Sequence, residues 1–289
     1  MYFFQSICYN EINDAGTVRN RPTILFVGME KNMKLLALGD VVSAAGCEFV
    51  RKKLPGIKKE YGIDICIANA ENSAVGNGTL PFSADYLFSS GVDFLTGGNH
   101  SFRRKEIFPY LESHNDMIRP YNMHPSNPGN GIGVMDMGRY KIGVINLIGN
   151  SYFNVSYANA FDALDKAIDA VADCKIKIVD FHAEATGEKK ALAYYADGRV
   201  SVLFGTHTHI QTADADILPS GTGYITDLGM CGVKNSVLGV EPDNVIQMLR
   251  TGMPTRFNAA SGECMLNGCI FEIDEKTGLT VSVETLVYG

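Results

Sequence analysis

The chain has 289 residues, of which 46% are hydrophobic and 20% are charged, and its formal net charge is −7. This composition is typical of a globular protein long enough to bury a full core, and it excludes a disordered, collagen-like or coiled-coil chain. The acidic balance argues against duplex nucleic acid binding on a broad basic face, and no apolar run is long enough for a membrane span.

The first 32 residues differ from the rest of the chain. Met33 is followed by the apolar run Lys34–Asp40, which is how a compact α/β domain often begins. We therefore expect residues 1–32 to be an extension or a start-site artefact, and residues 33–289 to form one domain. The alternative is that Thr23–Gly28 is an edge strand of that domain. No basic region precedes the short apolar start, so no secretory signal is expected.

Apolar runs alternate with amphipathic stretches after Met33. Pro55 and Pro109 lie inside two of the helices predicted below, where a proline can break the helix. Thr79 is a candidate N-cap for a helix that starts at Pro81. In chain order, the predicted elements are strand Leu35–Leu38, helix Cys47–Tyr61, strand Ile63–Ala68, helix Pro81–Ser90, strand Val92–Thr96, helix Arg103–Ser113, strand Lys141–Ile148, helix Phe161–Val171, and strands Lys175–Phe181 and Val200–Phe204.

The C-terminal region has a sequence pattern typical of strands rather than helices. Cys264–Asp274 and Leu279–Val287 flank the turn signal Glu275–Gly278 and predict a β-hairpin. The whole order predicts an α/β fold whose sheets are covered by helices. In such folds the carboxyl ends of the strands bring their loops to one rim, where ligands bind.

Polar side chains recur just past the predicted strands. They are an Asp, a Glu-Asn pair, an Asn-His pair, a single His and a His-x-His motif. In order, these residues are Asp40, Glu71, Asn72, Asn99, His100, His182, His207 and His209. Each residue by itself could have a purely structural role, because a lone Asp often caps a turn and a lone His often lies in a core. Their order and their repeated position at strand ends make the set a candidate site.

Oxygen and imidazole donors of this kind suit Mn, Fe or Zn, and no thiolate joins the set. The donors outnumber what one tetrahedral ion needs, which favours two metal ions with Glu71 as a bridging carboxylate. Two ions about 3.5–4 Å apart can bind a hydroxide between them and clamp the oxygens of an in-line displacement. That chemistry indicates phosphoester hydrolysis. His114 and His124 match no motif and are expected on the surface or in loops.

Seven scattered cysteines form no CxxC pair, and several lie in apolar runs. An odd number of unpaired, apolar-flanked cysteines is typical of reduced, buried thiols in a cytoplasmic protein.

Longer motifs make the resemblance specific. The sequence resembles the calcineurin-like metallophosphoesterases, and within them the bacterial YmdB-like subfamily. The resemblance runs from about Met33 to the C-terminus. The similar runs are Asn69–Asn72, Gly98–His100, Arg119–Asn122, Asp180–Thr186, Gly205–Asp214, Tyr224–Met230 and Thr251–Phe257.

The resemblance implies a single domain of two packed, mixed β-sheets flanked by helices. It implies a binuclear phosphodiesterase that acts on 2′,3′-cyclic nucleotides, with Fe or Mn as the metals and Zn or Mg as alternatives. One ion would be bound by Asp40, Glu71 and His209, with Asn72 nearby. The resemblance also implies a second ion, whose ligands would be Glu71, Asn99, His182 and His207. His100 would protonate the leaving oxygen.

The sequence departs from the family pattern at two places, and other functions remain as alternatives. Val42 occupies a position where the superfamily usually has His, and Asn72 could compensate. Ser101-Phe102 replaces an arrangement expected to include Trp, which leaves the substrate-facing surface less defined. A metallo-β-lactamase-like site is disfavoured because Gln211-Thr212 follows the His-x-His motif.

A phosphomonoesterase or nuclease on the same scaffold stays open. A regulatory protein that binds nucleotide or RNA machinery with little turnover also stays open, as does a homo-oligomer. Neither a membrane nor duplex nucleic acid is expected as a partner.

Overall fold

The computed structural model describes residues 6–12, 18–24 and 32–289, and the chain divides into two compact units, Met1–Lys31 and Asn32–Gly289. In the first unit, β1 (Ser6–Ile12) pairs antiparallel with β2 (Val18–Ile24). The strand expected at Thr23–Gly28 overlaps the end of β2, and its residues from 25 onward lie outside the described ones. That residues 1–32 are an extension stays a prediction.

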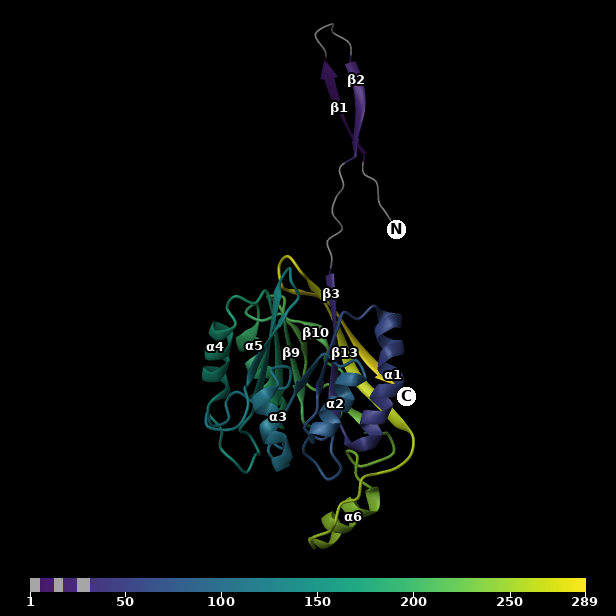
Figure 1. The fold of residues 1–289 in the computed structure, drawn as a ribbon, viewed down its shortest axis with the longest axis vertical. Coiled ribbons are helices and arrows are strands. Elements are labelled where there is room, and N and C mark those ends of the chain that lie inside the picture. Colours follow the sequence, from purple (N-terminus) through teal and green to yellow (C-terminus); the bar gives the residue numbers. More distant parts are fainter. Residues whose placement is uncertain (1–5, 13–17, 25–31) are drawn as a thin grey trace. The chain divides into compact units, whose positions relative to one another are not determined.

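The second unit is built on two six-stranded mixed sheets (Figure 1). In the first sheet, with the order β14-β13-β12-β3-β4-β5, the strands are β3 (Asn32–Val41), β4 (Ile65–Asn69), β5 (Phe94–Thr96), β12 (Met230–Val233), β13 (Cys264–Asp274) and β14 (Thr280–Tyr288). In the second, with the order β10-β11-β9-β8-β7-β6, they are β6 (Ile132–Asp136), β7 (Lys141–Ile148), β8 (Ile176–His182), β9 (Val202–Thr206), β10 (Asp216–Ile217) and β11 (Gly223–Ile225).

Alternation along the buried strands builds three layers of core. Leu36 and Leu38 of β3 pack on the helix side of the first sheet, while Leu35 and Ala37 pack between the two sheets. Helices α1 (Ser43–Tyr61) and α2 (Pro81–Ser89) cover the first sheet. Helices α4 (Ala160–Ala170) and α5 (Thr186–Ala196) cover the second, and Figure 1 shows them opposite α1. The predicted α/β class with two packed mixed sheets is confirmed.

Prolines shape two helices differently. Pro55 lies on the exposed side of α1, which continues through it to Tyr61. The predicted helix Arg103–Ser113 is wrong as one element. It consists of a 3₁₀ turn, η1 (Lys105–Ile107), and then α3 (Phe108–Ser113), with Pro109 in the first turn of α3, where proline is tolerated.

The predicted cap of α2 is also wrong. Leu80 is the N-cap residue, and its backbone N–H donates to Ser83 Oγ over 3.0 Å. The hydroxyl of Thr79 instead donates over 2.6 Å to the carbonyl of Ala70, at the start of the loop that joins β4 to α2. The hairpin of β13 and β14 is confirmed.

Sequence patterns missed several elements, namely helices α5 and α6 (Pro242–Thr251) and strands β6, β10, β11 and β12. Helix α6 has no buried residue, and Figure 1 shows it set apart from the two sheets.

Five of the six cysteines whose side chains are described are buried and Cys264 is half-buried, and all six are free; the side chain of Cys8 lies outside the described part. Within the described residues, no helix combines the length and apolar character that crossing a bilayer requires.

Candidate metal centre

All the side chains expected in the site come from one edge of the paired sheets. The first sheet supplies them near the ends of β3, β4 and β5, and the second near the ends of β8 and β9. They are Asp40, Glu71, Asn72, Asn99 and His100 from the first sheet and His182, His207 and His209 from the second. Carboxyl ends of parallel strands share an edge, so residues far apart in the chain meet here.

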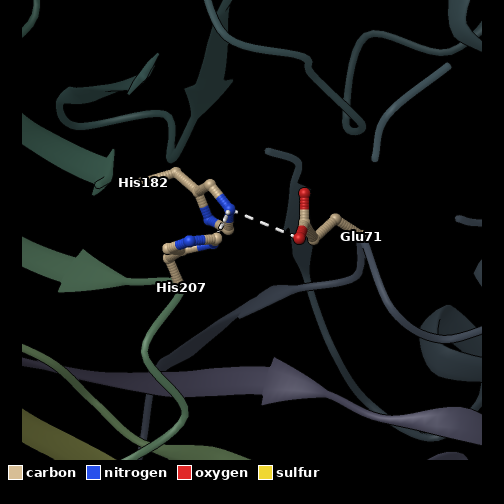
Figure 2. A group of neighbouring side chains, drawn as sticks. All are labelled: Glu71, His182 and His207. Carbon is tan, nitrogen blue, oxygen red and sulfur yellow. Dashed lines mark hydrogen bonds and ion pairs between the residues drawn. The ribbon is translucent and has the colours of Figure 1, made fainter. Parts of the chain in front are cut away.

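Three of these side chains form a tight group (Figure 2). One donor atom each from Glu71, His182 and His207 lies within 4.8 Å of the others. His182 Nε2 is 3.3 Å from Glu71 Oε1 and 3.0 Å from His207 Nδ1. Asn99 Oδ1 also lies 2.9 Å from His182 Nε2. Four atoms able to donate lone pairs therefore converge in a buried place, which suits a cation.

The tautomer of His182 follows from its other ring nitrogen. Thr206 Oγ1 donates to Asp180 Oδ1 over 2.7 Å, so it accepts from His182 Nδ1 over 2.9 Å. Nδ1 therefore carries a proton in both ionisation states of the ring, and Nε2 is the nitrogen that would lose its proton to bind a cation, which is the usual arrangement behind a metal-ligating His. Asn69 Nδ2 donates to Asp180 Oδ2 over 3.0 Å and so ties the first sheet to the second.

Asp40 and His209 lie beside this group rather than in it. His209 Nε2 is 3.5 Å from Asp40 Oδ1, and the backbone N–H of His207 donates to Asp40 Oδ2 over 3.0 Å. Asp40 Oδ1 is buried and accepts no hydrogen bond. An unsatisfied buried carboxylate oxygen is costly, so this atom fits a role as a cation ligand.

Asn72 links the two sets. Its Nδ2 lies 3.1 Å from Glu71 Oε1 and 3.3 Å from His209 Nε2. In this orientation the amide presents its nitrogen, so binding a cation through Oδ1 would require the amide to rotate.

His100 contacts the group from its open side. Its Nδ1 lies 3.1 Å from Glu71 Oε1, and its backbone N–H donates to Glu71 Oε2 over 2.8 Å. The side chain is 30% exposed, whereas that of Glu71 is fully buried. The two histidines without a motif lie elsewhere: the ring of His114 stacks on Tyr110, and His124 accepts from the Ser126 backbone.

Charges in this cluster shift one another's ionisation. Burial alone would raise the pKa of Glu71, but the neighbouring His182 and His100 hold it well below its ordinary value. Burial alone would lower the pKa of His182, but the carboxylates of Glu71 and Asp40 raise it to about 9. Burial and the neighbouring His182 lower the pKa of His207 to about 3. The cluster thus holds a proton on His182 and keeps His207 neutral.

Metal-free protein should therefore lose stability as the pH rises from about 6.5 to about 9, because the folded state alone keeps the His182 proton in this range. His209, whose pKa Asp40 raises against the effect of burial, contributes in the same direction. Urea unfolding in the presence of a chelator, followed across this pH range, measures the effect. A free energy of unfolding that stays level or rises would contradict it.

Gly98 allows the backbone to pass close to the cluster. A Cβ atom there would collide with Glu71 Oε2 and His182 Nε2. We expect Gly98→Ala to cost about 1–3 kcal/mol of stability from overpacking. Gly56→Ala on α1 is the matched control, because no heavy atom lies within 4 Å of the added Cβ, and it should stabilise the helix by ~0.5–1 kcal/mol. Thermal unfolding of both variants measures the difference, and equal shifts would contradict it.

A cavity of about 730 Å³ opens beside the cluster. Glu71, His100, His207 and His209 contribute to its wall, and Glu71 is the one acidic residue among the described residues that line it. The remaining polar and aromatic wall includes Arg103 and Arg104, which no motif singled out, and Arg256 and Phe257 from the similar run Thr251–Phe257.

Sequence reasoning gave no role to three supporting residues, although each lies in one of the similar runs. Asp180 begins the run Asp180–Thr186, and Thr206 lies in the run Gly205–Asp214. Asp227 follows the three-residue strand β11, and its position just past a strand was a usable signal.

Several known proteins are similar to this chain. A 2′,3′-cyclic-nucleotide 2′-phosphodiesterase of Bacillus subtilis is 38% identical over 255 residues, which are 88% of this chain and 97% of the relative. The crystal structure of a phosphatase from Mycoplasma pneumoniae has a TM-score of 0.85 and 36% identity, covering 90% of this chain and 94% of that chain. NAD nucleotidase of Haemophilus influenzae, at 12% identity and a TM-score of 0.56, shares the fold over 89% of this chain and 56% of its own.

The fold and the site together define a metal-dependent phosphoric ester hydrolase of the metallophosphoesterase type. Residues 36–286 match the family model described as YmdB-like protein. The chain belongs to the YmdB-like family, as the sequence motifs predicted.

Proposed function

We propose that this protein is a phosphodiesterase that hydrolyses 2′,3′-cyclic nucleotides with two bound divalent or mixed-valence metal ions. The observation that carries the proposal is the convergence of Glu71, Asn99 and His207 on His182 Nε2, beside the unsatisfied Oδ1 of Asp40. The Bacillus subtilis relative, named as a 2′,3′-cyclic-nucleotide 2′-phosphodiesterase, supports the choice of substrate.

The proposed ligands fall into two sets that share Glu71. Asp40, Glu71 and His209 would hold one ion, with Asn72 beside it, and Glu71, Asn99, His182 and His207 would hold the other. Nitrogen and oxygen donors without a thiolate favour Fe or Mn, with Zn or Mg as alternatives. When bound, such ions activate a water at neutral pH and stabilise charge on phosphoryl oxygens.

His100 is the proposed general acid. Glu71 holds its ring through Nδ1, which leaves Nε2 to give a proton to the leaving sugar oxygen. The ring lines the cavity and is partly exposed, so a substrate oxygen can reach it. Proton donation of this kind is typically worth about 10²–10⁴ in rate.

The cavity wall supplies the proposed substrate contacts. Arg103 and Arg256 offer guanidinium groups to a phosphate, and the exposed ring of Phe257 offers a stacking surface to a base. A local excess of cations over the single acidic side chain Glu71 suits an anionic ligand, although the whole chain is acidic. We also propose that the enzyme works in the cytoplasm.

Metal analysis of anaerobically purified protein, paired with a panel of 2′,3′-cyclic nucleotides, linear phosphodiesters and phosphomonoesters, tests the proposal. We expect two metal ions per chain and the highest kcat/KM for the cyclic nucleotides. Fewer than two ions under full loading would contradict the binuclear site. Turnover confined to monoesters would contradict the substrate, and tight partner binding without turnover would favour a regulatory protein.

A further inference from the structure

A buried ion pair lies behind the His-x-His segment. Lys189 of α5 and Asp227, which follows β11, are both fully buried, and Lys189 Nζ lies 2.6 Å from Asp227 Oδ2. Desolvation offsets much of the attraction in such a pair, and apolar residues of similar size often stabilise a fold as well. A stability role therefore does not account for the pair by itself.

Asp227 binds the backbone between the two histidines. Its Oδ2 accepts from the N–H of Thr208 over 3.1 Å, and Thr208 separates His207 from His209. The backbone carbonyl of Asp227 also accepts from the N–H of Thr212 over 3.1 Å. The segment that carries both imidazoles is thus attached to Asp227 at two points.

The same carboxylate reaches toward Asp40. Asp227 Oδ1 accepts from the N–H of Gly229 over 2.9 Å, and the carbonyl of Gly229 accepts from the N–H of Asp40 over 3.1 Å. One buried carboxylate therefore connects the His-x-His segment of the second sheet with the candidate ligand on β3 of the first sheet.

The backbone at both histidines requires such support. His207 has φ 101° and His209 has φ 64°, and both values lie in the left-handed region that side chains disfavour. Conformations of this kind persist only where the surroundings hold them. Gly205, just before this segment, allows close packing on both sides, because a Cβ there would collide with the Thr226 carbonyl oxygen and would lie 2.8 Å from Lys189 Cδ.

We infer that the Lys189–Asp227 pair is a positioning device that holds His207, His209 and Asp40 in their metal-binding arrangement. This inference rests on the proposed function. Asp227 fixes the backbone through the N–H groups of Thr208 and Gly229, and Lys189 supplies the opposite charge that keeps the buried carboxylate available as an acceptor.

Asp227→Asn is the first test variant, because an amide has one acceptor oxygen where the carboxylate has two. Lys189→Met/Asp227→Asn is the second variant, and it leaves no unpaired buried ammonium if the single variant fails to fold. The control is Asp93→Asn, alone or with Lys58→Met, at a Lys–Asp pair that is partly exposed rather than buried. Asp93 Oδ2 accepts from Lys58 Nζ over 2.8 Å and from the Cys66 N–H over 2.7 Å, at the opposite ends of β4 and β5 from the site.

Two measurements read out the positioning role. Titration of Mn²⁺ into each folded protein should show affinity at least ~10-fold weaker for the Asp227 variants, the loss expected when a group behind a metal ligand is removed. The Asp93 control should keep the affinity of the wild type even where its Tm falls equally. Hydrogen–deuterium exchange of metal-free protein should be faster at residues 207–212 in the Asp227 variants only.

Unchanged exchange at residues 207–212 in the Asp227 variants would overturn the inference, as would Mn²⁺ affinity equal to that of the control. Wild-type protein that binds no Mn²⁺, Fe²⁺ or Zn²⁺ would contradict the proposed function instead. In that case the exchange measurement still decides whether the pair holds the segment.

Discussion

Glu71→Ala should abolish binding of both metal ions and lower kcat/KM by more than ~100-fold, since changes behind a metal ligand alone cost 10–100-fold. Glu71 is fully buried, and its Oε1 contacts His182, His100 and Asn72. Glu71 is the one residue that belongs to both proposed ligand sets. Metal content by atomic emission, measured together with turnover of a 2′,3′-cyclic nucleotide, checks the prediction.

Two further variants separate the metal effect from a folding effect. Glu71→Gln keeps the shape of the side chain but removes its charge, so it should fold and still lose metal. Asp85→Asn is the control. Asp85 lies away from the site and accepts a hydrogen bond of 2.6 Å from the Tyr110 hydroxyl, so this variant should change neither metal content nor turnover. Two metal ions retained by Glu71→Ala would remove Glu71 from the ligand set.

His100→Ala should keep both metal ions and lose about 10²–10⁴ in kcat for cyclic nucleotides, which is the size expected for removal of a general acid. The loss should be much smaller for a p-nitrophenyl diester, because p-nitrophenolate leaves without being protonated. Comparing kcat for the two substrates, with metal content measured on the same samples, distinguishes proton donation from ligation.

Two other results for His100→Ala would contradict its role as the general acid. An equal loss on both substrates would argue that His100 acts on Glu71 or on substrate binding rather than as an acid. Loss of metal from His100→Ala would make His100 a ligand.

The ordered strand ends carried most of the predictive information about the site. Parallel strands deliver their carboxyl ends to one edge, so the positions of Glu71, His182 and His207 in the chain were enough to expect them together. The close group of these three side chains agrees with that expectation.

Residues that support the site could not be read from local patterns. Lys189 lies in a charged stretch of α5 that resembles an exposed helix face, yet its side chain is fully buried. Its burial depends on Asp227, which is distant in the chain. Helix α6 was missed although its apolar residues Ile246 and Leu249 lie at helical spacing. Both are exposed, and the ends of the helix are marked by Pro242 and by Gly252 with φ 67°.

Local sequence signals also failed to predict one helix cap and two short strands. Thr79 has the character of an N-cap, but its hydroxyl binds the carbonyl of Ala70 beside the site. Strands β10 and β11 are two and three residues long, too short to show any periodicity.

The position of the site across two sheets bears on when it can assemble during synthesis. Asp40 sits on β3, which pairs with β12 and, through Leu38 opposite Gly268, with β13 near the end of the chain. The first sheet therefore cannot close around Asp40 until nearly the whole chain has been made. Contacts between residues so distant in sequence form late in folding. We expect metal capture to follow release of the completed chain, so nascent chains truncated before residue 264 should hold no metal.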